Sequence, residues 1–428
     1  MHTQVAVIGS GFGALTCAAL LAQKGLRVTV LEQNYLPGGC TSSYWRKGFV
    51  FEAGATTVVG MDEHMPLKQV ADATGINFPL RKLDLPMLVH LPQGGVLRRH
   101  QDLSQWIEEA SLRFPGDQEG FWRRAYEVSQ FVWSRSGRYK SFPPSRWADA
   151  KDLLTNFTMP DLKYAPLSFI STKAMMERYK VASPAFNAFV NEQLLITAQN
   201  KMEEVNFLFG AAALCYTNYS NYYVDGGLIN LVNPLIQYIE GKGGQVLMRT
   251  EVSNITRAAE RYVINTKKQG EFTSDFLVSG IPLNNTQSLF PSLNVREDKV
   301  MKSEQLNGAF QMGIGFKSEQ SFESLHHQIH LVTPLPYTGS NSIFLSLNHA
   351  QDTSRSDLPG CRVASISTHV PDPGETVVDG ATLEALVIDV LEQKGFLRKE
   401  DVIYQHSSTP KSWHKWTKRS WGFVGGYP

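Results

Sequence analysis

The sequence predicts an α/β fold that contains a Rossmann-like domain and a second, interleaved α+β domain. The first observation behind this prediction lies at the start of the chain. There the apolar residues 4–8 precede the turn Gly9-Ser10-Gly11-Phe12-Gly13-Ala14 and a helical pattern over residues 14–24. A second apolar stretch, residues 27–31, ends in Glu32. Strand, turn, helix and strand in this order predict a βαβ unit of a parallel sheet.

The second observation is a block of similar elements in the middle of the chain. An amphipathic helical pattern over residues 229–240 leads to a strand that we expect to continue through residues 257–267. The pair Gln269-Gly270 has the composition of a hairpin turn, and the strand after it is expected to end near Val278. These strands can extend the sheet that begins at the N-terminus.

The N-terminal turn has the residues that bind the diphosphate of an adenine dinucleotide. Gly9 permits the tight turn, Gly11 lets the backbone approach the diphosphate, and Ala14 keeps the helix close to the strand. The helix N-terminus offers free N–H groups and the positive end of its dipole to the phosphates. Glu32 can accept both ribose hydroxyl protons and disfavours a 2′-phosphate.

A second loop, residues 36–43, indicates which dinucleotide binds. It contains the pair Gly38-Gly39 and the side chains Cys40 and Thr41. A flavin is held more extensively than a nicotinamide, so a further loop with N–H groups and hydroxyls favours FAD as the cofactor.

These motifs resemble the flavin amine oxidase and phytoene desaturase superfamily, which carries a glycine pair shortly after the ribose acid. The stretch Gly48-Phe49-Val50-Phe51-Glu52-Ala53-Gly54 is similar to the family element "GF-x-F-D-x-G", with Glu52 in place of the usual Asp. Many members have Arg or Lys at the position of Cys40, and cysteine is closer to the carotenoid isomerase and retinol saturase branch. The middle block resembles the second family block, so Val252 is expected to lie against the adenine. The resemblance also implies cofactor contacts from these residues: Ser10, Phe12, Gly13, Gln33, Cys40, Thr41, Gly54, Ala55 and Thr56.

The resemblance implies a Rossmann-like FAD-binding domain and an α+β substrate domain that alternate along the chain. We expect FAD-binding segments at residues 1–85 and 210–285, and substrate-domain segments at residues 86–209 and 286–400. Residues 401–428 would begin a C-terminal segment that borders the cofactor and substrate. The family continues beyond Gly425-Gly426 with a further strand and helix. This chain is therefore expected to be either a truncated version, which we favour and which should lack bound flavin, or a variant that retains flavin weakly.

Periodicity predicts further elements in the two substrate-domain segments. These are helices at residues 103–114, 119–133, 184–197 and 380–394, and strands at residues 328–332 and 363–370.

Composition excludes several classes of function. The chain of 428 residues has 41 basic and 40 acidic residues, so it gives no argument for nucleic acid binding. Its four cysteines are scattered without a C-x-x-C spacing, and a reducing, cytoplasmic compartment is the default expectation. No hydrolase or Walker motif occurs. His326, His327 and His330 lie in a strand pattern without a carboxylate partner, so we expect no metal site.

Residues 121–180 leave two interpretations open. They contain 11 Lys or Arg and 5 Asp or Glu, together with several large aromatic residues: Trp122, Phe131, Trp133, Tyr139, Phe142, Trp147, Phe157 and Phe169. Basic and aromatic residues together can attach a protein peripherally to a membrane surface. The interpretation we favour is a substrate domain with aromatic residues in its core and solvated charges.

The resemblance implies an FAD-dependent oxidoreductase that acts on an apolar small molecule, a long polyene of the carotenoid or retinoid kind. Desaturation, isomerisation and saturation are all open, each by hydride chemistry at flavin N5, for which the protein supplies positioning and a dry channel. We nominate no general acid or base, although Glu52 and Thr56-Thr57 would lie near the flavin ring. Two alternatives remain: an amine or protoporphyrinogen-type oxidase, and a non-enzymatic prenyl-lipid-binding protein such as the Rab GDP-dissociation inhibitors.

Overall fold

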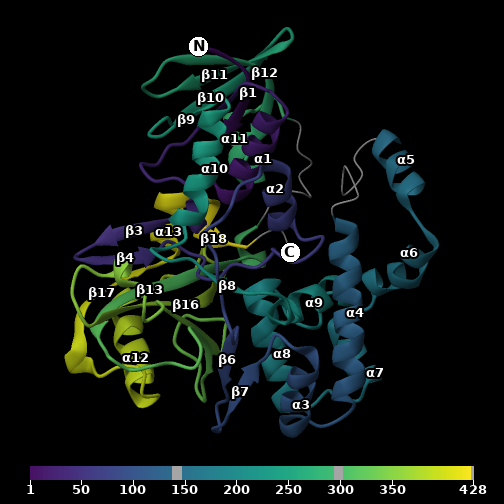
Figure 1. The fold of residues 1–428 in the computed structure, drawn as a ribbon, viewed down its shortest axis with the longest axis vertical. Helices are drawn as coiled ribbons and strands as arrows, with labels where there is room; N and C mark the ends of the chain where they lie inside the picture. Colours follow the sequence, from purple (N-terminus) through teal and green to yellow (C-terminus); the bar gives the residue numbers. More distant parts are fainter. Residues whose placement is uncertain (137–146, 294–301, 426–428) are drawn as a thin grey trace.

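The computed structural model describes residues 1–136, 147–293 and 302–425. Two β-sheets lie one above the other in the view of Figure 1, and a lobe of helices lies beside them. The N-terminus lies in the upper sheet, while the C-terminal end of the described chain lies near the middle of the molecule.

The first sheet has six strands in the order β10-β11-β12-β1-β2-β9. Strand β1 pairs in parallel with β2 and β12, and β2 pairs in parallel with β9. The strands are β1 (His2–Ile8), β2 (Val28–Leu31), β9 (Gln245–Leu247), β10 (Val252–Ala258), β11 (Arg261–Thr266) and β12 (Glu271–Ser279).

Helices α1 (Phe12–Gln23) and α10 (Ile229–Gly241) cover one face of this sheet, and α2 (Pro66–Thr74) packs against α1. Helix α1 is buried mainly through small side chains, among them Ala18, Ala19 and Ala22, and these let it pack closely against β1. The arrangement puts the N-terminus of α1 at the carboxyl edge of the parallel strands, where ligands bind in such folds.

The second sheet follows the order β17-β13-β16-β15-β14-β6-β7, and β18 also pairs with β13. Helix α12 (Gly380–Gln393) packs against one of its faces. The strands are β6 (Met87–His90), β7 (Val96–Arg99), β13 (Asn307–Lys317), β14 (His326–His330), β15 (Ser342–Leu347), β16 (Cys361–Pro371), β17 (Val402–Ser408) and β18 (Phe423–Val424).

The two faces of this sheet differ in chemistry because successive side chains point to opposite sides. Phe310, Met312 and Ile314 of β13 belong to the apolar core under α12, together with alternate residues of the neighbouring strands. On the other face, Gln311 lies opposite Ser367, and Ser367 lies opposite Phe344. That second face is rich in buried polar side chains: Gln311, Gln328, His326, His330, Ser342, Ser346 and Ser365.

The helical lobe has a core of aromatic side chains, among them Trp106, Trp122, Phe186 and Phe189. Its helices are α3 (Leu103–Arg113), α4 (Gln118–Ser136), α5 (Trp147–Asn156), α6 (Met159–Tyr164), α7 (Thr172–Arg178), α8 (Pro184–Thr197) and α9 (Phe207–Leu214). The remaining elements are the hairpin β3 (Ser43–Arg46) and β4 (Phe49–Glu52), the pair β5 (Arg81–Lys82) and β8 (Tyr222–Tyr223), and helices α11 (Leu283–Leu289) and α13 (Pro410–Thr417).

The four helices expected at residues 103–114, 119–133, 184–197 and 380–394 are present with small shifts at their ends. The continuous strand expected over residues 257–267 is wrong. Ala259 adopts a left-handed conformation with φ 54°, and the chain reverses there between β10 and β11. No glycine marks this turn, so no local sequence pattern predicts it. The strand expected at residues 328–332 begins at His326 and ends at His330.

Candidate functional site

A cavity of about 680 Å³ lies at the N-terminus of α1. Most of the predicted cofactor-binding residues line it, namely Gly9, Ser10, Gly11, Phe12, Gly13, Ala14, Glu32, Gln33, Gly38, Gly39, Cys40, Thr41 and Val252. They come from the ends of β1 and β2, the loop after β2 and the start of β10, which the sheet order brings together.

The space beside the first loop fits a bound diphosphate. Gly9 has φ 88°, which a residue with a side chain rarely adopts. A Cβ atom at Gly11 or Gly13 would meet no protein atom within 4 Å, so the cavity reaches the backbone there. Gly11 caps α1 without a side-chain hydrogen bond, and the first N–H groups of the helix remain available to an anion.

Glu32 is buried at the end of β2, where Oε2 accepts hydrogen bonds from the Ser10 backbone N (2.7 Å) and from Ser10 Oγ (2.7 Å). Its Oε1 accepts from the backbone N of Asn34 (2.8 Å). A carboxylate oxygen has two lone pairs, so Oε2 uses both of its acceptor positions and Oε1 keeps one. The side chain is therefore oriented by the protein, and its Oε1 can still accept a hydrogen bond from a ribose hydroxyl.

The second glycine loop lies directly against the first. The Gly38 backbone N donates to the carbonyl of Ser10 (2.9 Å). Gly38 has φ 97°, and a Cβ atom on it would lie 2.9 Å from Val232 of α10. Glycine at this position therefore lets α10 and both loops meet, which holds the wall of the cavity in place.

Several lining residues were not among the predicted cofactor contacts. Asn34 reaches the C-terminal segment, because its Nδ2 donates to the Trp416 carbonyl (3.0 Å). Thr250 donates its backbone N–H to the carbonyl of Glu32 (2.6 Å). Lys418 follows α13 and lines the same cavity as Asn285 of α11. These contacts join segments that are distant in the sequence, and no local pattern signals them.

A second cavity, of about 880 Å³, adjoins the first. Cys40 and Arg419 line both cavities. Gly54, Ala55 and Thr56 line the second cavity and not the first, although the backbone N of Ala55 donates to the Cys40 carbonyl (3.0 Å). Their cofactor contact stays a prediction. Burial raises the pKa of the Cys40 thiol, and Arg419 opposes that rise.

The wall of the second cavity has a polar and an apolar side. The polar side comes from the second sheet, through Gln311 of β13, Ser342 of β15 and His369 of β16. The apolar side comes from the helical lobe and α13: Trp133, Ile196, Val205, Phe209, Ala212, Ala213 and Trp413. Such a cavity can hold an apolar chain and bind a polar group along one side.

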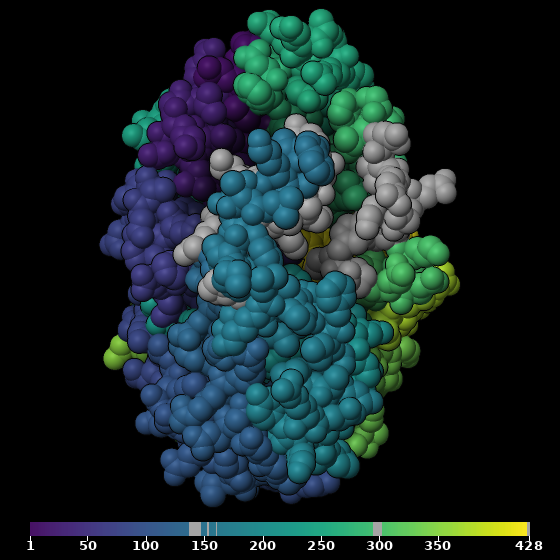
Figure 2. Space-filling view, turned by 90° about the vertical axis from the view of Figure 1, so that its right-hand side faces the viewer, coloured from purple at the N-terminus to yellow at the C-terminus, as the bar shows by residue number. Residues whose placement is uncertain are grey.

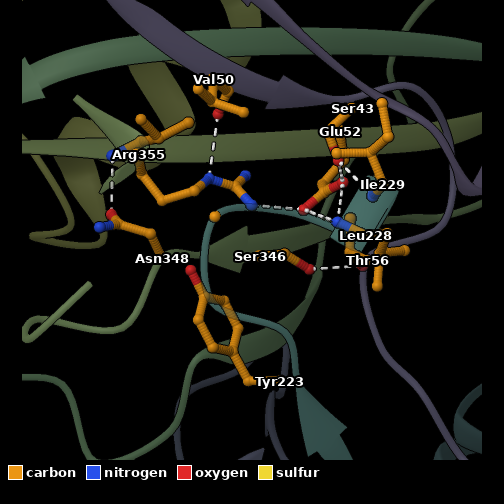
Figure 3. Close-up of polar contacts among 12 residues, drawn as sticks. Ser43, Val50, Glu52, Thr56, Tyr223, Leu228, Ile229, Ser346, Asn348 and Arg355 are labelled. Carbon is orange, nitrogen blue, oxygen red and sulfur yellow. Dashed lines mark hydrogen bonds and ion pairs between the residues drawn. The ribbon is translucent and has the colours of Figure 1, made fainter. Parts of the chain in front are cut away.

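A chain of hydrogen bonds leads from Thr56 into the second sheet. Ser346 Oγ donates to Thr56 Oγ1 (2.8 Å), which Figure 3 shows, and lies 2.8 Å from Nδ1 of His326. Because the Ser346 hydroxyl has one hydrogen, the His326 ring donates to it. Burial lowers the pKa of His326 to about 4, so the ring is neutral near pH 7.

A buried ion pair supports the region between the two sheets. Arg355 Nη1 donates to Oε1 of Glu52, and Ser43 Oγ donates to Oε2 (2.6 Å), as Figure 3 shows. The backbone N of Leu228, just before α10, also donates to Glu52 (3.1 Å to Oε2). The Glu52 side chain lines neither cavity, and its expected position near the flavin ring stays a prediction. The hydrogen bond that Glu52 accepts from Leu228 positions the start of α10.

The histidines of β14 lie in the interior of the second sheet. His327 Nδ1 and His90 Nε2 are 3.1 Å apart, and both rings pack near Phe396. Burial lowers the pKa of His327 to about 3. Among residues 1–136, 147–293 and 302–425, no group of three or more His, Cys, Asp or Glu could hold a metal ion.

The region of the basic and aromatic residues divides between core and surface. Trp122 is fully buried in the helical lobe, whereas Trp147 and Phe169 are 81% and 92% exposed. Tyr139 and Phe142 lie outside the described residues. No described helix is both long and apolar enough to cross a bilayer.

Comparisons with known proteins agree with the fold and the cavity. A family model described as flavin containing amine oxidoreductase matches residues 15–425. This description confirms the predicted flavin cofactor and the resemblance to this superfamily.

Three curated relatives are similar over part of the chain. Prolycopene isomerase 2 of an Oncidium hybrid cultivar is 27% identical over 256 residues, which are 58% of this chain and 43% of the relative. All-trans-retinol 13,14-reductase of Danio rerio is 26% identical over 58% of this chain and 42% of the relative. Phytoene desaturase (neurosporene-forming) of Cereibacter sphaeroides is 24% identical over 58% of this chain and 47% of the relative. The chain thus matches less than half the length of each relative.

Solved structures show the same fold at low sequence identity. A protein from Pyrococcus furiosus superposes with a TM-score of 0.65 and 15% identity, covering 95% of this chain and 88% of that one. Wild-type putrescine oxidase bound to putrescine superposes with a TM-score of 0.61 and 14% identity, covering 98% and 87%. These likenesses confirm the predicted fold class.

Proposed function

Because this chain belongs to the flavin containing amine oxidoreductase family, we propose that it is an FAD-dependent oxidoreductase that acts on a long apolar polyene of the carotenoid or retinoid kind. The reaction is a desaturation, an isomerisation or a saturation. The relatives named as prolycopene isomerase, retinol reductase and phytoene desaturase support this substrate class.

The observation that carries the proposal is the junction of the two cavities at Cys40 and Arg419. FAD bound in the first cavity, with its diphosphate at Gly11, supplies a centre that accepts or donates hydride. The apolar side of the second cavity then binds the polyene and excludes water from the junction. In this proposal Glu32 binds the ribose, and Val252 packs near the adenine.

The test is to express the complete gene in cells that make carotenoids and to analyse their pigments. We expect one polyene to be consumed, and the product distinguishes the three reactions. A desaturation shifts absorption to longer wavelength, an isomerisation changes chromatographic retention without a change of mass, and a saturation adds two hydrogens. A Gly11→Ala variant, designed to weaken FAD binding, is the control and should convert less of the polyene.

Two experimental results would contradict this proposal, and each would indicate a different function. Release of peroxide with amines, without any reaction of polyenes, would indicate an amine oxidase. Lipid that co-purifies with the protein but is not converted with any electron acceptor would indicate a lipid-binding protein.

We also propose that the protein associates peripherally with a membrane, where a polyene would reach it. Large apolar side chains are exposed on α5, α6 and the turn after them; we call this set the α5–α6 apolar surface, and it consists of Trp147, Leu154, Phe157, Met159, Leu162 and Phe169. Figure 2 shows α5 and α6, in blue, on the outer surface. The Phe207 backbone N donates to the Ile170 carbonyl (2.7 Å), which brings the end of this surface close to Phe209 in the second cavity.

A further inference from the structure

The polar side of the second cavity contains a set of hydrogen-bond acceptors that the proposed polyene chemistry does not use. Ser340 and Ser342 line the cavity at the start of β15, and His369 lies beside them on β16. The Gly339 backbone N donates to the His369 carbonyl (2.9 Å), and Thr368 Oγ1 donates to the Ser342 carbonyl (2.9 Å). A purely apolar chain would leave the polar groups in this part of the wall without a hydrogen-bond partner.

A buried carboxylate behind the wall fixes the direction of the two serine hydroxyls. Glu192 of α8 is 6% exposed and does not line the cavity itself. Its Oε2 accepts from Ser340 Oγ (2.5 Å) and Ser342 Oγ (2.7 Å), and its Oε1 accepts from the Asn341 backbone N (2.9 Å).

Both serines therefore act as acceptors toward the cavity. A hydroxyl has one hydrogen and two lone pairs, and each of these hydrogens is committed to Glu192. Ser342 Oγ also accepts a long hydrogen bond from Gln328 Nε2 (3.3 Å), and Ser340 Oγ accepts one from the Ser342 backbone N (3.3 Å). Each oxygen keeps one lone pair for a ligand.

Gln199 adds a third acceptor to the same wall. Its Nε2 donates to Nε2 of His369 (3.2 Å), and its Oε1 is buried without a hydrogen-bond partner. Its backbone is held at φ 58°, a conformation that residues other than glycine seldom adopt. Burial lowers the pKa of His369 to about 4, so this ring is neutral and accepts the hydrogen.

We propose that Ser340, Ser342 and Gln199 form a subsite for a hydrogen-bond donor, and that the substrate is a polyene with a terminal hydroxyl group. This inference rests on the proposed function and narrows its substrate class. A hydroxyl can donate to one of these acceptors, whereas a hydrocarbon leaves them buried and unpaired. A carboxylate would be repelled by the lone pairs of the serine oxygens and by the negative charge of Glu192 behind them. A buried ammonium would need direct contact with a carboxylate, and the serines separate it from Glu192.

The position of this subsite also orients the chain. Ser342 and Ser346 are four residues apart on β15, which corresponds to roughly 13 Å of strand. Ser346 contacts Thr56, in the segment beside Cys40 where the two cavities meet. A hydroxyl bound at Ser342 is thus held away from Thr56 and Cys40, and a more central part of the chain reaches them.

The test measures binding without turnover. Trp133 and Trp413 line the cavity, so a conjugated tetraene bound there quenches tryptophan fluorescence. The probes are octadecatetraenes that end in a hydroxyl, a methyl, a carboxylate or an ammonium group. We expect the alcohol to bind about tenfold more tightly than the hydrocarbon, as for one well-formed hydrogen bond, and more tightly than the two charged probes.

A Glu192→Gln variant should shift the preference of the subsite from the alcohol probe toward the carboxylate probe. The amide keeps the shape of the side chain, but its NH₂ group donates to the serine oxygens and releases their hydrogens toward the cavity. We expect the carboxylate to gain affinity by about tenfold, because it accepts the released hydrogens. The alcohol should keep its advantage over the hydrocarbon, because its oxygen can also accept a hydrogen bond. Ser342→Ala should weaken only the alcohol. Ser365→Ala is the matched control, because Ser365 is a buried serine on the same sheet face that does not line the cavity.

The outcomes separate this proposal from the proposed function. Equal binding of alcohol and hydrocarbon would overturn the subsite while leaving the polyene function intact. The same loss for all probes in Glu192→Gln and Ser365→Ala would also overturn it, because that result indicates a purely structural role. Tightest binding of the ammonium probe would overturn it in favour of an amine subsite. Quenching by none of the four probes would contradict the proposed function itself.

Discussion

Gly11 and Gly280 show how the same substitution should act through different mechanisms. A Cβ atom at Gly11 would point into open space, whereas at Gly280 it would lie 2.4 Å from Ala14 Cβ and 3.0 Å from the Ile8 carbonyl oxygen. The absence of a side chain at Gly11 leaves space for a ligand, whereas its absence at Gly280 lets Ala14 and Ile8 pack closely against the backbone. This difference separates a binding role from a packing role at neighbouring points of one cavity.

We predict that Gly11→Ala lowers FAD affinity at least about tenfold and changes the stability of the FAD-free protein by less than about 1 kcal/mol. The added methyl occupies ligand space, and the φ of −57° at Gly11 suits alanine. Gly280→Ala should instead destabilise the protein by about 1–3 kcal/mol through overpacking. Flavin fluorescence titration and urea unfolding measure the two effects. Equal FAD affinity in Gly11→Ala and the wild type would refute the assignment of this loop to the cofactor.

The sequence reveals the residues of the first cavity better than those of the second. Gly9, Gly11 and Glu32 stand in one local unit, and their spacing alone predicts that they surround a ligand. Glu192 and Gln199 could not be found in this way. Their role depends on Ser340 and His369, which reach them only when the helical lobe packs on the second sheet. The cofactor contacts themselves stay predictions.

At the level of elements, the contact of β4 with α10 depends on the ion pair between Glu52 and Arg355. Both side chains are buried, and Glu52 also accepts from the residue that precedes α10. A carboxylate at the N-terminus of a helix also interacts favourably with the positive end of the helix dipole. Since α10 packs against Gly38, the pair supports the second glycine loop indirectly.

We predict that Arg355→Met destabilises the protein by about 3–5 kcal/mol, because it leaves Glu52 charged and unpaired in the interior. The double variant Glu52→Gln with Arg355→Met should be less destabilised than the sum of the single changes. Urea unfolding gives the three free energies. Arg98→Met, which removes an exposed ion pair with Glu323, is the control and should cost at most about 1 kcal/mol. Additive effects of the two buried changes would show that the pair is not coupled.

Elements with a regular apolar period were predictable, and elements defined by tertiary contacts were not. Helices α8 and α12 follow from their periodicity alone. The reversal at Ala259 has no turn residue, and the sequence therefore reads as one strand. The histidine strand β14 was recognised as a strand, but four of its five residues are polar and all five are buried, so the usual rule that polar residues are exposed fails there.

For the whole molecule, the α5–α6 apolar surface places the proposed membrane contact beside the second cavity. Monomeric proteins rarely expose so many large apolar side chains together, and such surfaces mark interaction sites. The basic residues of the same region suit anionic lipid.

The domain boundaries at residues 85, 209, 285 and 400 remain predictions. The strands of each sheet come from segments that alternate along the sequence.

We predict that the protein sediments with vesicles of phosphatidylcholine and phosphatidylglycerol. Replacing Trp147 and Phe169 by Ser should reduce the bound fraction several-fold, since each exposed aromatic side chain contributes apolar burial. Val377→Ser is the control, because Val377 is 85% exposed but lies outside this surface. Binding that is unchanged in the double variant, or lost equally in the control, would contradict the assignment.

The two-faced second sheet has a consequence for how this protein can change. Its alternate residues serve the core under α12 and the cavity wall in turn, so a slip of one position in strand pairing would exchange the two sets completely. That penalty locks the alignment of the strands. It also separates two evolutionary tasks: mutations at every second position can alter substrate choice while the residues between them continue to maintain the fold.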